Sequence, residues 1–307
     1  SLRYEHFLSY NESSSYFRLT QFQLQYSLEK LVLRVGNFNE TLGNGLLVRG
    51  YEITGSVFEE EAYRSRYGFY RDLLGFSASY RGDIWYMKTI RGKSLVNTLP
   101  PTLPMEERRI DLVEAVETGI SFYYQTLGLI LMRNSNPFEK DYFYSLLFSG
   151  SIPGVISYNL EYAHQMSGRT PLFAMQDGTR YGLYGSLSYS LGGFGVSIEY
   201  KNYHDLLIGT GISDPPTAVR EHKYKVLNRS IHVPQLQDES GIQVEAYYTF
   251  RNFQRLVFNY ARSVNEFGTS FVFEEFFTEF SFYPGRRSHV TLFGDYATDD
   301  FRSEDLR

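Results

Sequence analysis

The sequence has no cysteine and a single tryptophan among its 307 residues. The lack of cysteine excludes a disulfide scaffold, a thiolate metal site and a cysteine nucleophile. The sequence also has no excess of positive charge, since its formal net charge is −5, and this gives no reason to expect a nucleic-acid partner. Apolar residues make up 42% of the chain and charged residues 21%, a composition that excludes a disordered protein.

The sequence also lacks an uninterrupted apolar run of the roughly 20 residues that a transmembrane helix needs. Two uncharged runs, 142–160 and 181–198, approach that length. The first has Gly150 and Pro153 near its centre, and the second has the pair Gly192-Gly193. Because such residues interrupt a helix and favour a turn, each run predicts a β-hairpin.

Aromatic residues are abundant, with 27 Tyr and 25 Phe, yet the mean hydropathy is negative. A soluble chain of this length would form one large domain or two ordinary ones. Many aromatic residues in a polar sequence suggest instead the strands of a membrane β-barrel, which are apolar on one face only.

Apolar and polar residues alternate along many segments, as expected of strands whose successive side chains point to opposite faces. In 194–203, Phe194 and Ile198 belong to an apolar face, whereas Glu199 and Lys201 belong to a polar one. Six further segments alternate in the same way, namely 21–26, 154–163, 181–190, 241–250, 254–262 and 275–282. Two segments, 126–133 and 142–149, are apolar at both odd and even positions, so alternation does not orient them.

A soluble β-sandwich would alternate too. The expected strands, however, are about 8–12 residues long, close to the ~9–11 residues that cross a bilayer at a tilt. Short turns also alternate along the chain with long connections, chiefly 37–73, 91–112, 164–180 and 204–240, which is typical of outer-membrane barrels. The sequence therefore predicts an all-β fold, an antiparallel transmembrane β-barrel of about 14–16 strands that forms a single domain over residues 1–307.

Fifteen strands are predicted, at 2–8, 16–27, 30–36, 74–80, 83–90, 113–123, 126–133, 142–149, 154–163, 181–190, 194–203, 241–250, 254–263, 269–283 and 289–297. A closed antiparallel barrel needs an even number. Either one strand is miscounted, then, or the chain is part of a larger barrel. The sequence begins at Ser1 without an initiator methionine, which suggests a removed leader or a fragment.

Three motifs resemble a known group of proteins. They are 35–46 followed by Arg49-Gly50, the segment 198–203, and Asp214-Pro215-Pro216-Thr217 with the residues that follow as far as Gly241. Over about residues 16–297 the chain is similar to uncharacterised, porin-like outer-membrane barrels from Bacteroidetes and Chlorobi-type bacteria. The resemblance implies a location in the outer membrane of a Gram-negative bacterium and further strands in longer relatives. It implies no particular solute.

The strand faces opposite the aromatic rows carry charged and amide side chains that would cost several kcal/mol each in hydrocarbon. Two interpretations fit these side chains: a hydrated pore whose charged wall sets selectivity, or a plugged, salt-bridged interior. A barrel of this size is wide enough for an aqueous lumen. The candidates for lining the pore are Gln21, Gln23, Arg34, Glu161, Glu199, Lys201, Glu245, Arg255, Asn259, Glu275 and Glu279.

Two connections have unusual compositions. The glycine-rich segment 36–50 lacks the Lys-Ser/Thr and the βαβ setting of a phosphate-binding loop, so it predicts a tight bend or an inward-folded loop. The connection 204–240 is stiffened by prolines and is basic, which suggests either a solvated external loop or a constriction of the bore. The candidate constriction residues are Arg220, His222, Lys223, Lys225 and Arg229.

No pair of the six histidines has the spacing of a zinc site, and no nucleophile elbow is present. The sequence therefore predicts no enzyme, cofactor or metal site. Two functions remain: a channel for passive passage of small hydrophilic solutes or ions, or a structural barrel that anchors partner proteins without conducting. The expected partners are outer-membrane lipid and other outer-membrane subunits.

Overall fold

A computed structural model describes residues 1–7, 16–60, 65–95, 109–166, 173, 175, 178–209, 212–220, 223, 238–266, 269–285 and 288–300. Fifteen strands form one antiparallel sheet in the order β1-β2-β3-β6 and then consecutively to β17, while β4 and β5 pair only with each other. The strands of the large sheet are β1 (Leu2–Phe7), β2 (Tyr16–Ser27), β3 (Leu31–Phe38), β6 (Leu73–Arg81), β7 (Trp85–Ser94), β8 (Leu112–Phe122), β9 (Gln125–Ser135), β10 (Lys140–Ile152), β11 (Ile156–Gln165), β12 (Tyr181–Leu191), β13 (Phe194–His204), β14 (Asp238–Thr249), β15 (Arg255–Asn265), β16 (Phe271–Gly285) and β17 (Ser288–Asp299).

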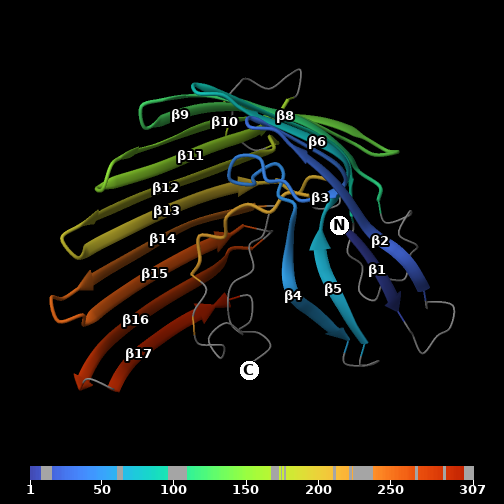
Figure 1. The fold of residues 1–307 in the computed structure, drawn as a ribbon. Helices are drawn as coiled ribbons and strands as arrows, with labels where there is room; N and C mark the ends of the chain where they lie inside the picture. The colour runs from blue at the N-terminus through green and yellow to red at the C-terminus, as the bar shows by residue number, and fades with distance from the viewer. Residues whose placement is uncertain are drawn as a thin grey trace.

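The large sheet curves into an arch, with β1 and β17 at its two edges in the part of the chain that the structure describes (Figure 1). Each of the fifteen strands predicted from the sequence corresponds to one strand of this sheet, so the prediction of an antiparallel all-β fold is confirmed. The two uncharged runs are the hairpins β10–β11 and β12–β13, as predicted. Among the described residues no helix combines the length and the apolar character needed to cross a membrane.

The prediction was incomplete within 37–73, which was expected to be a connection without strands. This segment contains β4 (Tyr51–Glu60) and β5 (Ser65–Arg71). The alternation in β4 breaks at Gly55, and the pairing register shifts between Glu52 and Val57. A strand with an interrupted period gives a weak sequence signal.

The lengths of the connections differ between the two ends of the arch. One end has short turns, at 28–30, 82–84, 123–124, 153–155, 192–193 and 250–254. The other end has the long connections 39–72, 95–111, 166–180 and 205–237. These two ends are called the short-turn end and the long-loop end below.

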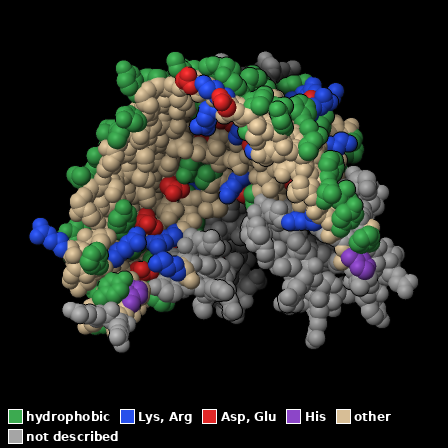
Figure 2. Space-filling view, in the orientation of Figure 1, with side chains coloured by type: hydrophobic (Ala, Val, Ile, Leu, Met, Phe, Trp, Pro, Cys, Tyr) green, Lys and Arg blue, Asp and Glu red, His purple; other side chains and the backbone are tan. Residues whose placement is uncertain are grey.

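The two faces of the sheet differ in character. Figure 2 shows hydrophobic side chains along the convex face. Exposed apolar side chains of the sheet include Leu24, which is 72% exposed, and its cross-strand neighbour Val35. Paired residues of an antiparallel sheet share a face. On the concave face, accordingly, Gln25 lies opposite Arg34 and Glu245 opposite Asn259. An outer surface this apolar cannot be stable in water unless something apolar covers it.

Candidate pore interior

Two connections fold into the concave side of the arch. The first, 39–50, turns tightly at Gly43 and Gly45, whose φ angles of +53° and +90° suit glycine. Thr41 and Arg49 form an isolated antiparallel bridge across the base of this turn. The second is the described part of 205–220. The two segments bond to each other, because Arg49 N donates to Ile212 O at 3.0 Å and Asp214 N donates to Gly45 O at 3.3 Å.

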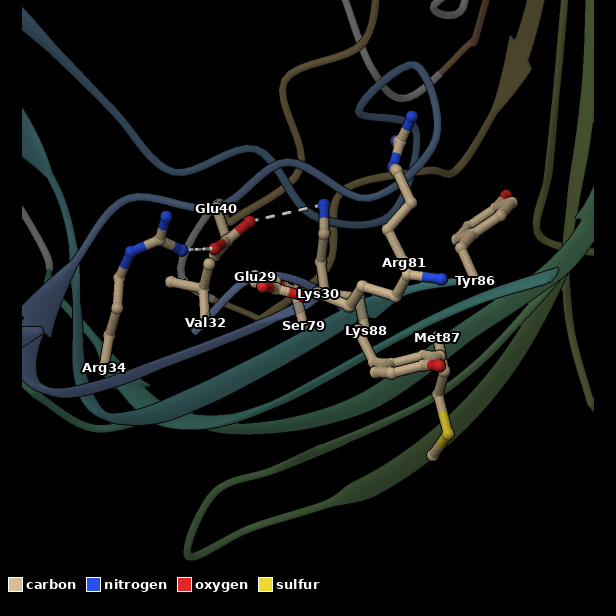
Figure 3. Close-up of a pocket in the computed structure, with 11 residues that line it drawn as sticks. Glu29, Lys30, Val32, Arg34, Glu40, Ser79, Arg81, Tyr86, Met87 and Lys88 are labelled. Atoms are coloured by element: carbon tan, nitrogen blue, oxygen red, sulfur yellow. Dashed lines mark hydrogen bonds and ion pairs between the residues drawn. The ribbon is translucent and has the colours of Figure 1, made fainter. Parts of the chain in front are cut away.

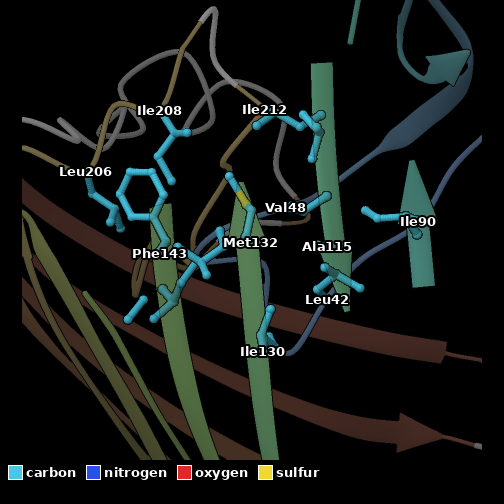
Figure 4. Close-up of a cluster of buried hydrophobic side chains, with 14 of the residues drawn as sticks. Leu42, Val48, Ile90, Ala115, Ile130, Met132, Phe143, Leu206, Ile208 and Ile212 are labelled. Atoms are coloured by element: carbon cyan, nitrogen blue, oxygen red, sulfur yellow. The ribbon is translucent and has the colours of Figure 1, made fainter. Parts of the chain in front are cut away.

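An apolar cluster holds these segments against the sheet. The fully buried side chains of the first segment are Leu42, Leu46, Leu47 and Val48, and they share one cluster with Leu206, Ile208 and Ile212 of the second. The wall contributes inward-facing residues from β7 to β10, among them Ile90, Ala115, Ile130, Met132 and Phe143 (Figure 4). This packing explains why segments 126–133 and 142–149 are apolar at both odd and even positions. One face of each strand points outward, and the other packs under the folded loops.

Polar wall residues fix the tip of the first segment. The buried carboxylate of Glu161 accepts hydrogen bonds from Asn44 N at 2.5 Å and from Ser145 Oγ at 2.8 Å. At the base of the turn, Lys88 Nζ donates to Thr41 O at 2.8 Å and lies 3.3 Å from a carboxylate oxygen of Glu40. Buried polar groups need such partners, so these contacts specify where the turn sits.

The second segment is fixed by a buried ion pair. Lys201, with no exposed surface, pairs with Glu239 and donates to Thr217 O at 2.5 Å. Tyr203 donates its hydroxyl proton to Pro216 O at 2.7 Å. The described residues 212–220 therefore lie against the wall rather than forming a solvated external loop. The backbone carbonyl groups of this proline-stiffened segment accept the hydrogen bonds that Lys201 and Tyr203 donate.

The residues expected at a constriction fall in different places. Arg220 forms an ion pair with Glu245 at 2.9 Å, and its guanidinium lies 5.3 Å from the ring centre of Phe277. Lys223 is exposed. The other three, His222, Lys225 and Arg229, lie outside the described residues.

The remaining candidates for lining the pore are distributed along the inner face. Glu199 accepts a hydrogen bond from Tyr184 Oη at 3.0 Å. Gln21 donates to Asp72 at 3.2 Å, and Arg255 lies 5.0 Å from the ring centre of Tyr247. Gln23 is half-buried, and buried side chains are found at Asn259, Glu275 and Glu279.

A hollow remains below the first segment, towards the short-turn end. It has a cavity volume of about 340 Å³, and its charged lining includes Arg34, Glu40, Arg81 and Lys88 (Figure 3). Sequence reasoning missed Lys88 and Glu40. Strand β7 begins with three successive apolar residues before Lys88, and Glu40 lies just beyond the end of β3. Neither Lys88 nor Glu40 therefore belonged to a segment with regular alternation of apolar and polar residues.

Charge is unevenly distributed over the concave face. Strands β3, β6 and β7 point the cations Arg34, Arg81 and Lys88 inward. Strands β13 to β17 point mainly anions inward, namely Glu199, Glu239, Glu245, Glu275, Glu279, Asp295 and Asp299, alongside Lys201 and Arg255. Arg34 and Lys88 share the carboxylate of Glu40, so the first wall keeps a reduced positive excess, and an ion inside the arch would lie between this wall and the acidic one. Within the described ranges, no group of three or more His, Asp or Glu side chains is arranged to hold a metal ion.

No protein-family model matches the sequence, and no curated protein sequence matches it. Solved structures do match. A BenF-like porin from Pseudomonas fluorescens Pf-5 aligns with a TM-score of 0.53 and 12% identity over 94% of this chain and 74% of the porin. Pseudomonas aeruginosa OpdQ aligns with a TM-score of 0.54 and 12% identity over 93% and 78% of the two chains. The outer-membrane protein opdK of the same species aligns with a TM-score of 0.51 and 13% identity over 96% of this chain and 79% of opdK. The chain therefore has the fold of porin barrels.

Proposed function

We propose that this protein is an outer-membrane, porin-like channel of a Gram-negative bacterium, through which small hydrophilic solutes or ions pass passively. The observation that carries the proposal is the contrast between the two faces of one curved sheet. The convex face presents exposed Leu, Val, Tyr and Phe side chains, whereas the concave face presents charges of both signs. Lipid tails can cover the apolar convex face, and water can hydrate the charged concave face. The fold shared with the Pseudomonas porins supports the same function.

In this proposal the two inward segments narrow the bore, and the inward charges select the solute. Charge separation between the basic strands β3, β6 and β7 and the acidic strands β13 to β17 would orient a dipolar solute on its way past the loops. The origin in Bacteroidetes or Chlorobi-type bacteria stays a prediction from the sequence resemblance. Membership of a larger barrel and contacts with other outer-membrane subunits stay predictions from the sequence. No enzymatic activity is proposed.

Planar-bilayer recording tests the channel directly. We expect the purified protein to give discrete, ohmic conductance steps after insertion into a lipid bilayer. Bilayers that stay silent despite verified insertion of the folded protein would contradict the channel. Silence combined with a co-purifying partner protein would favour the non-conducting scaffold.

Substitution Glu199→Gln should move the reversal potential of a KCl gradient towards anion selectivity, because it removes an inward negative charge while the amide oxygen can still accept the Tyr184 hydroxyl. Glu274→Gln is a matched control. Glu274 also accepts a tyrosine hydroxyl, from Tyr260 at 2.7 Å, but it pairs across the strands with outward-facing Arg262. The control should leave the reversal potential unchanged. Equal shifts for both variants would mean that Glu199 does not face the conduction path.

A further inference from the structure

The convex face has a cationic patch at the long-loop end of β7 to β10. Cross-strand pairing places Arg91 opposite Glu114, Glu114 opposite Arg133, and Arg133 opposite Tyr142. The next row towards the loops begins with Lys93 and ends with Lys140. We call Arg91, Lys93, Arg133 and Lys140 the outer cationic patch. Glu114 is the one carboxylate among the cross-strand neighbours of these four cations.

The geometry of the patch keeps its cations available to a ligand. Arg133 Nε lies 2.7 Å from Glu114 and Arg91 Nε lies 3.4 Å from it, so one carboxylate holds two guanidinium groups side by side. The arginine side chains are 58% and 42% exposed for Arg91 and Arg133, against 24% for Glu114. Lys93 and Lys140 are exposed as well. Glu114 neutralises one of the four charges and the exposed Glu139, next to Lys140 in the chain, offsets another, which leaves an excess of two positive charges on this surface.

The patch lies at the border of the apolar band. The next row towards the short-turn end contains Val116 and Leu131, and Leu131 is an exposed apolar residue of the convex face. In the direction of the long loops, β7 ends at Ser94 and β8 begins at Leu112. Cations at such a border meet the headgroup zone of a bilayer when the adjacent apolar rows meet its hydrocarbon.

Other described parts of the same rim do not share this charge excess. On β15 and β16, the outward Arg262 lies opposite the anion Glu274. On β13 and β14, His204 lies 3.3 Å from Asp238. The excess of cations over β7 to β10 is therefore a local feature of the convex face rather than a general property of its long-loop border.

We propose that the outer cationic patch binds the phosphate groups of a phosphorylated lipid in the leaflet on the long-loop side. Guanidinium groups donate paired hydrogen bonds to phosphate oxygens, and lysine ammonium groups add compact positive charges. The four cations extend over the neighbouring strands β7 to β10, about 14 Å at the usual strand spacing, so a headgroup that carries two phosphates suits the patch best. This inference rests on the proposed membrane location, but it concerns the convex face and not the conduction path.

Native mass spectrometry of the full chain in detergent micelles tests the inference, with bisphosphorylated lipid A as the probe. Wild-type protein should retain the lipid, and the variant Arg91→Gln/Lys93→Gln/Arg133→Gln/Lys140→Gln should retain at least fivefold less. Wild-type protein should retain dephosphorylated lipid A only weakly. That retention should be as low as the retention of bisphosphorylated lipid A by the quadruple variant. Arg262→Gln, which removes a cation from the same face and border, should retain lipid A like the wild type.

Three results would overturn the lipid assignment. One is equal retention by the wild type and the quadruple variant; another is equal loss in Arg262→Gln. The third is displacement of lipid A by inorganic phosphate at the same concentration, which would mean that the patch binds free phosphate. The double variant Lys93→Gln/Lys140→Gln, which leaves the contacts of Glu114 intact, should show a partial loss if the quadruple variant does not fold. Conductance recorded on the same proteins separates this inference from the channel: the patch variants should conduct like the wild type.

Discussion

Replacing residues 42–48 with two glycines is expected to raise single-channel conductance several-fold. Thr41 and Arg49 already face each other as bridge partners, so a two-residue link can close the gap as a hairpin turn. The deletion removes four fully buried apolar side chains and the tip that Glu161 holds. Conductance steps recorded in 1 M KCl would measure the widened path.

The deletion also uncovers apolar wall residues such as Ile130 and Met132, so a second variant with the full loop length is useful. Leu46→Asp/Leu47→Asp places two carboxylates in the apolar cluster, where an unpaired charge is strongly unfavourable, and should expel the segment. Phe138→Asp is the control, because this side chain is 93% exposed in the short β9–β10 connection. If both loop variants conduct like the wild type, segment 39–50 does not limit the flow of ions.

Lys201→Met is expected to lower the free energy of unfolding by roughly 3–5 kcal/mol, the usual effect of removing one partner of a buried ion pair. The substitution leaves the Glu239 carboxylate buried without its cation and removes the donor to Thr217 O. Denaturant unfolding of protein folded into lipid vesicles would measure the change. Trp85, the only tryptophan of the chain, lies half-exposed on the convex face and provides the fluorescence signal.

A second substitution separates the lost charge pair from a simple packing defect. In Lys201→Met/Glu239→Leu both charges are gone, so much of the stability should return. If the double variant is less stable than the single one, the ion pair is not the source of the effect. A single variant as stable as the wild type would show that Lys201 does not anchor the segment 212–220.

The strands of the large sheet were predictable because most of them face two different environments. In β13, for example, Ile198 is exposed on the convex face while Lys201 points inward, and this contrast produces a regular period of two. The strand β4 escaped prediction since it interrupts its own period at Gly55 and belongs to a separate two-stranded sheet.

The inward packing of the loops was harder to predict, because it depends on contacts between distant parts of the chain. Asn44 and Glu161 are 117 residues apart, and Lys201 meets Thr217 only once β13 and its following connection are folded. A signal was nevertheless present. Segments 126–133 and 142–149 are apolar on both faces, and in a barrel the second apolar face must have an apolar partner inside. The leucines at 42, 46 and 47 are that partner.

This double-sided apolar character has a consequence for how β9 is aligned with its neighbours. Shifting a strand by one residue exchanges its faces, and for most strands of this sheet such a slip would put charges into lipid. In β9 the slip would exchange the outward Leu129 and Leu131 with the inward Ile130 and Met132. Both pairs are apolar, so the free energy of contact with lipid would differ little between the two alignments. The correct alignment must then come from the ends of the strand, where Arg133 has to meet Glu114 on the outside and Asn134 lies fully buried on the inside. A few polar residues near the long-loop end thus determine which face of β9 points outward, since the rest of the strand is apolar on both faces.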